Sequence, residues 1–272
     1  MLVDAHGAWN DPGHLASELL CVNPEALCDA LLPRLEARPP SAWLNDFLQA
    51  DRRAARAVER HLLADEDLLE ARAVRELAAA LPDGALLYVS NSMPVRDLDA
   101  FLPASPRRLR VLCNRGANGI DGMLSSALGA AAAQAAPVVL LTGDLALLHD
   151  CGALLAARRH ALSLVIVVLD NDGGGIFSTL PIAGFGDAVG FETYFRTPHG
   201  IDLEPLCRGM GADFSWATSW EHLRASLKDA LSASGVSVVG LRVDRDRNLA
   251  QFRALETAVR EALAAPPEAA QP

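Results

Sequence analysis

The stretch that decides the fold is Leu164-Val165-Ile166-Val167-Val168-Leu169, followed by Asp170-Asn171-Asp172 and then Gly173-Gly174-Gly175. A continuous apolar run of this length predicts a strand that is buried on both faces, as parallel strands under crossover helices are. The acidic and amide residues that follow it, and then the glycines, predict a polar turn at the carboxyl end of the strand. In an open parallel sheet, ligands bind at this end of the strands.

Similar units lie on both sides of this stretch. Further apolar strands are predicted at 85–90, 110–113, 138–142, 214–217 and 236–243. Helices are predicted at 70–81, 94–102, 122–135, 146–159, 202–210 and 220–233, with a last helix running to about residue 264 and an irregular stretch between 176 and 201. Because strands and helices alternate, the sequence predicts an α/β fold with a doubly wound, mostly parallel sheet and helices on both faces.

The first part of the chain has a different pattern. Leu2-Val3-Asp4 is predicted to be the end of a strand with no partner nearby, which suggests that the chain starts inside a domain. A helix is predicted at 23–37, with Asn23 as N-cap and Pro24 at the first helical position. We therefore expect a remnant of another domain at 1–40, a linker helix at 41–65, the α/β domain at 66–264 and a frayed tail at 265–272.

Composition and charge exclude several classes of partner. The 272 residues carry a formal net charge of −10, so a nucleic acid or an anionic membrane surface would be repelled. Lys228 is the only lysine, and guanidinium groups therefore supply nearly all the positive charge. This pattern suits the binding of carboxylates or phosphates, but a genome-wide composition bias explains it equally well. The cysteines form no C-x-x-C pair, no signal peptide is evident, and the apolar run 127–141 is too short to span a membrane, so we expect a cytoplasmic protein.

Polar and glycine residues follow the predicted strands at the points where they end. They are Asn91-Ser92, Asn114-Arg115-Gly116, Gly143-Asp144 and the turn from Asp170 to Gly175. Because the carboxyl ends of parallel strands meet at one edge of a sheet, we expect these residues to line a single crevice.

A metal–diphosphate site is the most specific prediction for this crevice. Asp144 alone is most simply a helix N-cap, and Asn171 alone a turn residue. Together with a glycine carbonyl, however, their oxygens suit a hard cation such as Mg²⁺, which completes its octahedron with water and phosphate oxygens. The backbone N–H groups of Gly173-Gly174-Gly175 can approach an anion closely.

Five longer sequence motifs make the prediction of a metal–diphosphate site more specific. They are Ser90–Arg96 (SNSMPVR), Asn114–Gly122 (NRGANGIDG), Gly143–Asp150 (GDLALLHD), Asn171–Phe177 (NDGGGIF) and Thr197–Gly200 (TPHG). In this order they resemble the thiamine-diphosphate enzymes, and among them the 2-succinyl-5-enolpyruvyl-6-hydroxy-3-cyclohexene-1-carboxylate synthases of menaquinone biosynthesis, in their C-terminal part. Three positions depart from the family pattern: Leu145 replaces a glycine, Asp170 replaces an asparagine, and Arg196 stands where a small residue is expected.

The resemblance implies a role for each matched residue. Asp144, Asn171 and the carbonyl of Gly173 would bind the metal, Arg96 and Arg115 would bind substrate carboxylates, and Asn91, Ser92, Ile120, Gly143, Leu145, Gly174, Ile176 and Phe177 would contact the cofactor. Each has a plainer alternative, since arginines are commonly surface groups, apolar residues commonly core, and Asn or Ser commonly turn residues. Arg115 is the stronger of the two arginine candidates because it follows a strand predicted to be buried. His149 and His199 are expected to be structural.

The family's activity gives the expected function. The resemblance implies a transferase that joins decarboxylated 2-oxoglutarate to isochorismate, with thiamine diphosphate and Mg²⁺ (or Mn²⁺) as cofactors. It also implies a homodimer or homotetramer, and a pyrimidine-binding domain that this sequence lacks and that another chain or an N-terminal half would supply. The chain alone is then expected to be inactive, whether it is a fragment, a product of a misassigned start or one subunit of a split enzyme. Another thiamine-diphosphate 2-oxoacid enzyme, and a non-catalytic module that binds only Mg²⁺ and diphosphate, remain as alternatives.

Overall fold

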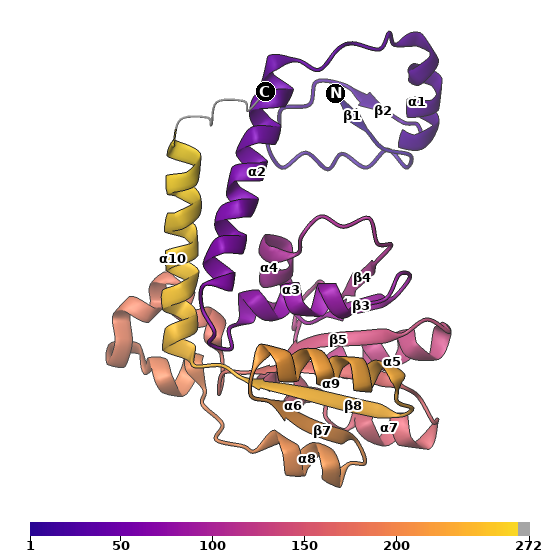
Figure 1. Ribbon diagram of the computed structural model, residues 1–272. Helices are drawn as coiled ribbons and strands as arrows, with labels where there is room; N and C mark the ends of the chain where they lie inside the picture. Colours follow the sequence, from indigo (N-terminus) through magenta and orange to yellow (C-terminus); the bar gives the residue numbers. More distant parts are fainter. Residues whose placement is uncertain (266–272) are drawn as a thin grey trace. The chain divides into compact units, whose positions relative to one another are not determined.

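The computed structural model describes residues 1–265 (Figure 1). The chain forms two compact units, Met1–Gln49 and the part from Ala50 onward, and the boundary between them falls inside helix α2 (Ala42–Leu63). The division at residues 40 and 65 stays a prediction. None of the helices within residues 1–265 combines the length and the apolar character that a membrane span needs.

The smaller unit corrects two expectations. Strand β1 (Leu2–Val3) has a parallel partner after all, β2 (Leu19–Leu20). Helix α1 (Pro24–Leu31) begins as predicted, because the Asn23 side chain accepts the N–H groups of the first turn. It ends earlier than predicted and passes into a 3₁₀ turn at Leu32–Arg34, since Pro33 has no N–H to continue the helical hydrogen bonds.

The larger unit contains a six-stranded sheet in which every pair of neighbours is parallel. Its strands are β3 (Leu86–Val89), β4 (Arg110–Cys113), β5 (Val138–Gly143), β6 (Leu164–Asp170), β7 (Asp213–Ala217) and β8 (Val236–Arg242). The order is β4-β3-β5-β6-β8-β7, so the chain first moves outward from β3 to β4 and then returns to place β5 on the other side of β3. The carboxyl edge between β3 and β5 is therefore a topological switch point, where ligands bind in such sheets.

Helices cover both faces of the sheet, which confirms the doubly wound α/β prediction (Figure 1). Successive strand residues alternate between the faces: Leu87 and Leu141 belong to one core, and Leu86 and Leu140 to the other. The first core is completed by α3 (Glu70–Ala80), α4 (Met93–Phe101), α9 (Trp220–Ser232) and α10 (Arg245–Ala264). The second is completed by α5 (Met123–Ala133), α6 (Asp144–Asp150), α7 (Ala153–Arg159) and α8 (Leu203–Gly209).

The larger unit differs from the sequence-based prediction in three places. The helix predicted at 146–159 is two helices, because the turn at Cys151 and Gly152 separates α6 from α7. The stretch predicted to be irregular contains short helical turns at Gly175–Thr179, Pro181–Val189 and Glu192–Arg196. Strand β4 lies at the sheet edge and is largely exposed, so the burial expected for the strand before Arg115 is wrong.

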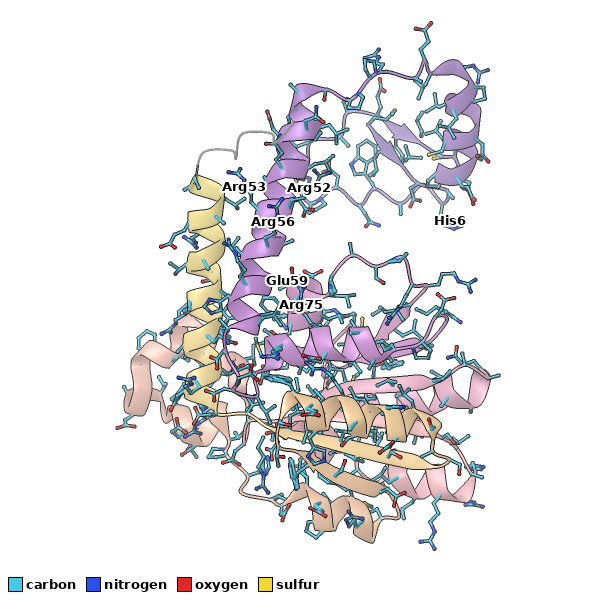
Figure 2. All side chains as sticks on the ribbon, viewed as in Figure 1. His6, Arg52, Arg53, Arg56, Glu59 and Arg75 are labelled. Atoms are coloured by element: carbon cyan, nitrogen blue, oxygen red, sulfur yellow. The ribbon has the colours of Figure 1, made fainter. Side chains whose placement is uncertain are left out.

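Arginine 53 of α2 links this helix to the end of α10 (Figure 2). Its Nη1 donates to the carbonyl of Ala265 at 2.5 Å, and a cation at a helix C-terminus also interacts favourably with the helix dipole. The tail predicted to fray at 265–272 lies, apart from Ala265, outside the described residues.

The core of the sheet makes a first testable prediction. Leu141 of β5 is fully buried three residues before Asp144, and truncating such a side chain leaves a cavity. We expect Leu141→Ala to lower the free energy of unfolding by about 2–5 kcal/mol. Urea denaturation measures this change, and Leu155→Ala, at a side chain that is 58% exposed, is the matched control. Equal loss in the two variants would contradict the burial of β5.

Candidate functional site

A cavity of about 360 Å³ lies at the switch point. Residues that follow β3, β4, β5 and β6 line it, as expected for polar residues at the carboxyl ends of parallel strands. Every residue predicted to bind metal, cofactor or substrate is among them: Asn91, Ser92, Arg96, Arg115, Ile120, Gly143, Asp144, Leu145, Asn171, Gly173, Gly174, Ile176 and Phe177. The structure thus brings the predicted residues together, while their individual roles stay predictions.

Asn91 organises the β3–β4 side of the cavity. Its side-chain amide donates to the carbonyls of Asn114 and Gly119, and its Oδ1 accepts a hydrogen bond of 2.8 Å from Nη1 of Arg115. A Cβ at Gly119 would lie 2.7 Å from the Asn91 side chain, so the glycine is required for this close approach. Asn91 therefore fixes both the loop after β4 and the guanidinium of Arg115.

Ser92 and Arg96 form the start of α4 on the same side. Ser92 has a φ of 71°, a conformation that is costly for a residue other than glycine. Its carbonyl accepts a hydrogen bond of 2.7 Å from Nη1 of Arg96, one helical turn further on. Both arginines predicted to bind substrate therefore line the cavity, and each guanidinium is held by one hydrogen bond, Arg96 to the carbonyl of Ser92 and Arg115 to Oδ1 of Asn91.

The other side of the cavity is built from Asp144 and the glycine turn after β6. Asp144 is 2% exposed; its Oδ1 accepts the N–H of Leu145 and its Oδ2 accepts the N–H of Gly173 at 2.9 Å. A Cβ on Gly173 would lie 2.1 Å from the carbonyl oxygen of Arg196, and φ at this glycine is +131°. The carbonyl of Arg196 also accepts the N–H of Gly174 at 2.6 Å. The loop that ends at Arg196 thus packs directly against the glycine turn.

The side chain of Arg196, where the family pattern has a small residue, is buried. Its Nη1 donates to the hydroxyl of Ser178 at 2.9 Å, and within residues 1–265 it is not among the groups that line the cavity. The Arg196 side chain therefore ties its loop to Ser178, and the residues that line the cavity are still those that the family pattern predicts.

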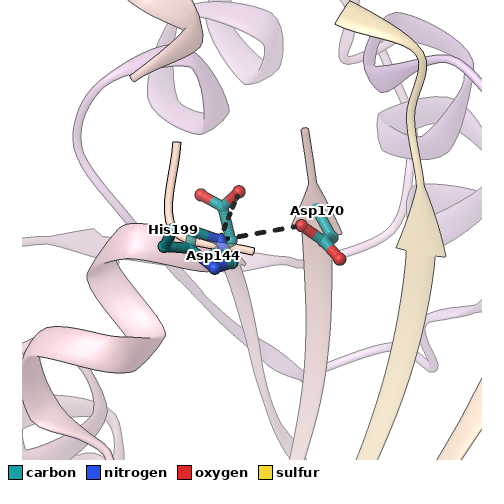
Figure 3. Close-up of side chains that lie close together, drawn as sticks. All are labelled: Asp144, Asp170 and His199. Carbon is teal, nitrogen blue, oxygen red and sulfur yellow. Dashed lines mark ion pairs between the residues drawn. The ribbon is translucent and has the colours of Figure 1, made fainter. Parts of the chain in front are cut away.

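His199 lies against Asp144 and Asp170 (Figure 3). Its Nε2 is 3.4 Å from Oδ2 of Asp144 and 3.9 Å from Oδ1 of Asp170. Its Nδ1 accepts the N–H of Ile201 at 2.9 Å, which in the neutral ring places the hydrogen on Nε2, facing the carboxylates. Burial and the neighbouring Asp144 raise the pKa of Asp170 to about 6.

Two sets of residues in this region could hold a divalent cation. Asp144, Asp170 and His199 bring possible ligand atoms within 4.8 Å of one another. The predicted set is Asp144, Asn171 and the carbonyl of Gly173. Each set contains a buried atom with no hydrogen-bond partner among residues 1–265, Oδ1 of Asn171 in the second and Nε2 of His199 in the first. The second set is favoured because all its members line the cavity and because the hydrogen on Nε2 of His199 prevents this nitrogen from acting as a ligand.

Glu70 is a member of the site that the sequence did not predict. It lies at the start of α3, is 2% exposed, and its Oε1 accepts a hydrogen bond of 2.8 Å from Nδ2 of Asn171. Asp97 of α4 is equally buried and its charge environment includes Glu70, but Oε2 of Glu70 and Oδ2 of Asp97 have no hydrogen-bond partner among residues 1–265. Burial raises the pKa of Glu70, and burial together with the charge of Glu70 raises the pKa of Asp97 well above its usual range. No sequence motif marks Glu70, because a glutamate in the first turn of a helix is ordinary.

Apolar side chains form the remaining wall. Ile120, Ile176 and Phe177 line the cavity, and Phe177 packs edge-to-face on Phe195 at 5.6 Å between ring centroids. The cavity therefore combines an acidic, glycine-rich end, an apolar wall and a basic rim. This arrangement suits an elongated ligand with a metal-bound anionic end and an apolar ring.

Known proteins match this chain in both sequence and fold. Residues 99–241 match the family model "Thiamine pyrophosphate enzyme, C-terminal TPP binding domain". The chain is 49% identical over 250 residues to the 2-succinyl-5-enolpyruvyl-6-hydroxy-3-cyclohexene-1-carboxylate synthase of Myxococcus xanthus (strain DK1622), an alignment that covers 92% of this chain and 42% of that protein. It is 42% identical over 267 residues to the synthase of the same name from Chloroflexus aurantiacus (strain ATCC 29366 / DSM 635 / J-10-fl), covering 97% and 45%.

Solved structures support the same fold. The thiamine diphosphate-dependent 4-hydroxybenzoylformate decarboxylase of Rhodococcus jostii RHA1 superposes with a TM-score of 0.54 at 25% identity, covering 66% of this chain and 33% of that chain. Benzoylformate decarboxylase from Polynucleobacter necessarius gives a TM-score of 0.52 at 19% identity, covering 63% and 32%.

The alignments cover nearly all of this chain but less than half of each synthase. The chain spans less than half the length of the two synthases named above, 42% and 45%, and corresponds to their C-terminal part. The match to the family model covers residues 99–241, which is more than half of this chain. The chain therefore belongs to the thiamine pyrophosphate enzymes and contains their C-terminal thiamine-pyrophosphate-binding domain.

Proposed function

We propose that this chain supplies the metal–diphosphate part of the active site of a 2-succinyl-5-enolpyruvyl-6-hydroxy-3-cyclohexene-1-carboxylate synthase. The complete enzyme would join decarboxylated 2-oxoglutarate to isochorismate in menaquinone biosynthesis. The observation that carries the proposal is the single cavity at the switch point, which gathers every residue of the predicted site.

Particular residues fit the cofactor. Asp144, Asn171 and the carbonyl of Gly173 would hold Mg²⁺ or Mn²⁺, since hard cations prefer oxygen ligands. The N–H groups of Gly173, Gly174 and Gly175 already donate to Asp144, Arg196 and Gly173, so the cation would hold the diphosphate at this turn. Ile120 and Phe177 would contact the ring. When bound, thiamine diphosphate supplies an electron sink for decarboxylation and carbon–carbon bond formation. Oδ1 of Asn171 is buried and has no hydrogen-bond partner in the described part of the chain, which supports this fit because such an oxygen is costly unless a ligand satisfies it.

The rim of the cavity fits the proposed substrates. Both 2-oxoglutarate and isochorismate carry two carboxylates, while the chain has a net charge of −10, so local cations are needed. Arg96 and Arg115 line the cavity and are each oriented by one hydrogen bond to a neighbour. The other N–H groups of each guanidinium can bind a carboxylate, and orienting two anions in this way reduces the entropy lost in the reaction.

The length of the curated relatives defines the test. Because these 272 residues correspond to less than half of them, we expect no turnover from this chain alone and turnover when the remaining part of such a synthase is supplied. The full chain is mixed with the separately expressed N-terminal part of the Myxococcus xanthus synthase and given isochorismate, 2-oxoglutarate, thiamine diphosphate and Mg²⁺. Formation of the named product supports the proposal. Decarboxylation without use of isochorismate would indicate another 2-oxoacid enzyme, and cofactor binding without any turnover would indicate a binding module.

Arg115 provides a prediction for substrate binding. In the reconstituted enzyme we expect Arg115→Ala to raise the KM for a carboxylate substrate by about tenfold to a hundredfold, because a charge-assisted hydrogen bond contributes about 1.5–3 kcal/mol. The affinity for thiamine diphosphate should change less than threefold. Steady-state kinetics and calorimetry measure the two quantities, and Arg159→Ala on α7, outside the cavity lining, is the control. Equal losses of cofactor and substrate affinity would contradict this role for Arg115.

A further inference from the structure

We propose that Glu70 is a positioning residue that holds the side-chain amide of Asn171 with its oxygen toward the cavity, ready to bind the cation. This inference rests on the proposed function, because it assumes that Asn171 is a metal ligand. It adds a residue from α3, far away in sequence from the glycine turn, to the cation site.

The contact between the two residues fixes the direction of the amide. Nδ2 of Asn171 donates to Oε1 of Glu70 at 2.8 Å, where an ionised oxygen or the carbonyl oxygen of the carboxyl group accepts the hydrogen. The amide nitrogen therefore faces Glu70, and Oδ1 points away from Glu70. This oxygen is buried and has no hydrogen-bond partner within residues 1–265, as expected of an oxygen that a cation would bind.

The surrounding structure leaves room for this orientation. A Cβ at Gly175 would lie 2.7 Å from Nδ2 of Asn171, so the glycine permits the amide nitrogen to reach Glu70. Glu70 is itself held at its backbone and at one side-chain oxygen. Its backbone N–H donates to Oδ1 of Asn248 on α10 at 3.1 Å, whereas its Oε2 has no hydrogen-bond partner among residues 1–265. Burial of Glu70 and the bond from Asn171 to Oε1 therefore set the direction of the carboxyl group.

Glu70 and Asn171 both line the cavity and are in direct contact, so Glu70 is close enough to the proposed cation site to orient Asn171 there. Residues that orient metal ligands in this way commonly change metal affinity by tenfold to a hundredfold when they are removed. In the absence of Glu70, the Asn171 amide could turn and present its N–H₂ group to the cation, which would repel it. The expected consequence is a loss of cation affinity that is larger than the loss of fold stability accounts for.

The test measures Mn²⁺ binding to the full chain in the presence of inorganic pyrophosphate, by electron paramagnetic resonance, so that it does not depend on catalysis. We expect Glu70→Ala to weaken Mn²⁺ binding by about tenfold to a hundredfold. Glu70→Gln should weaken it less than about threefold, because the Gln oxygen can still accept from Nδ2 of Asn171. Circular dichroism and thermal unfolding establish that each variant is folded.

An exchanged pair separates orientation from packing. Asn171→Asp places two carboxyl groups in contact and should weaken Mn²⁺ binding. Adding Glu70→Gln restores one donor and one acceptor with the same net charge, and should return the affinity to within about threefold of the wild type, or make it tighter. A purely structural role for Glu70 would not give this rescue.

The outcomes separate the two proposals. If the wild-type chain binds no Mn²⁺ with pyrophosphate, the metal–diphosphate assignment fails and the role of Glu70 fails with it. If the wild type binds Mn²⁺ and a folded Glu70→Ala variant binds it equally well, or the exchanged pair gives no rescue, the role of Glu70 alone is overturned.

Discussion

Replacing Asp144 with alanine should weaken Mg²⁺-dependent binding of thiamine diphosphate by at least about a hundredfold. The reason is that Asp144 is the one charged side chain among the proposed ligands, and even residues that only orient metal ligands cost tenfold to a hundredfold when lost. The carboxylate also accepts the N–H groups of Leu145 and Gly173, so its removal loosens the glycine turn. Isothermal titration calorimetry with and without Mg²⁺ measures the effect.

Two further variants show whether this loss is specific. Asp144→Asn keeps the size and one acceptor oxygen but removes the charge, and we expect it to lose most of the Mg²⁺-dependent binding while remaining folded. Asp229→Ala changes an exposed carboxylate on α9 and should leave binding unchanged. Cofactor affinity that Mg²⁺ still increases in the Asp144→Ala protein would remove Asp144 from the metal site.

Gly173→Ala should have the largest effect on the structure of the site. The added methyl group would lie 2.1 Å from the carbonyl oxygen of Arg196, where the contacting atom is backbone and cannot rotate away. The φ of +131° is also unfavourable for alanine. We expect the free energy of unfolding to fall by about 3 kcal/mol or more, and cofactor binding to be lost because the turn must move. Urea denaturation and calorimetry measure the two effects.

A second glycine serves as the control for this substitution. Gly129 lies on α5 with nothing within 4 Å of an added Cβ. In a helix, alanine is favoured over glycine, so Gly129→Ala should raise the free energy of unfolding by about 0.5–1 kcal/mol. If Gly173→Ala is as stable as this control, the close packing of the loop at Arg196 against the glycine turn is wrong.

The sequence was sufficient to predict the α/β architecture because its strands are continuous apolar runs. The run at 164–169 and its polar turn became β6 and one side of the cavity, as predicted. The burial of strand β4 was harder to predict. Val111 and Leu112 are apolar, as buried residues commonly are, but they lie at the sheet edge and are 42% and 38% exposed. Whether a strand is central or at the edge depends on the order of strands in the sheet, which no local pattern records.

The sequence predicted those site residues that stand in recognisable motifs. It missed those whose place in the site depends on contacts between residues that are far apart in the sequence. Asp144 and Asn171 stand in motifs at strand ends. Glu70, in contrast, is 101 positions away from Asn171, and only the packing of α3 against the sheet brings the two together. The position of His199 beside Asp144 likewise depends on the loop after the glycine turn, which Asp172 holds by accepting the N–H groups of His199 and Gly200.

The most direct test of the central claim is the position of the cation. Crystals of the full chain grown with Mn²⁺ and thiamine diphosphate give an anomalous peak for the metal. We predict a peak about 2.0–2.3 Å from an oxygen of Asp144, Oδ1 of Asn171 and the carbonyl oxygen of Gly173, with diphosphate oxygens completing the coordination. A peak between Asp144, Asp170 and His199, without contact to Asn171, would contradict the account.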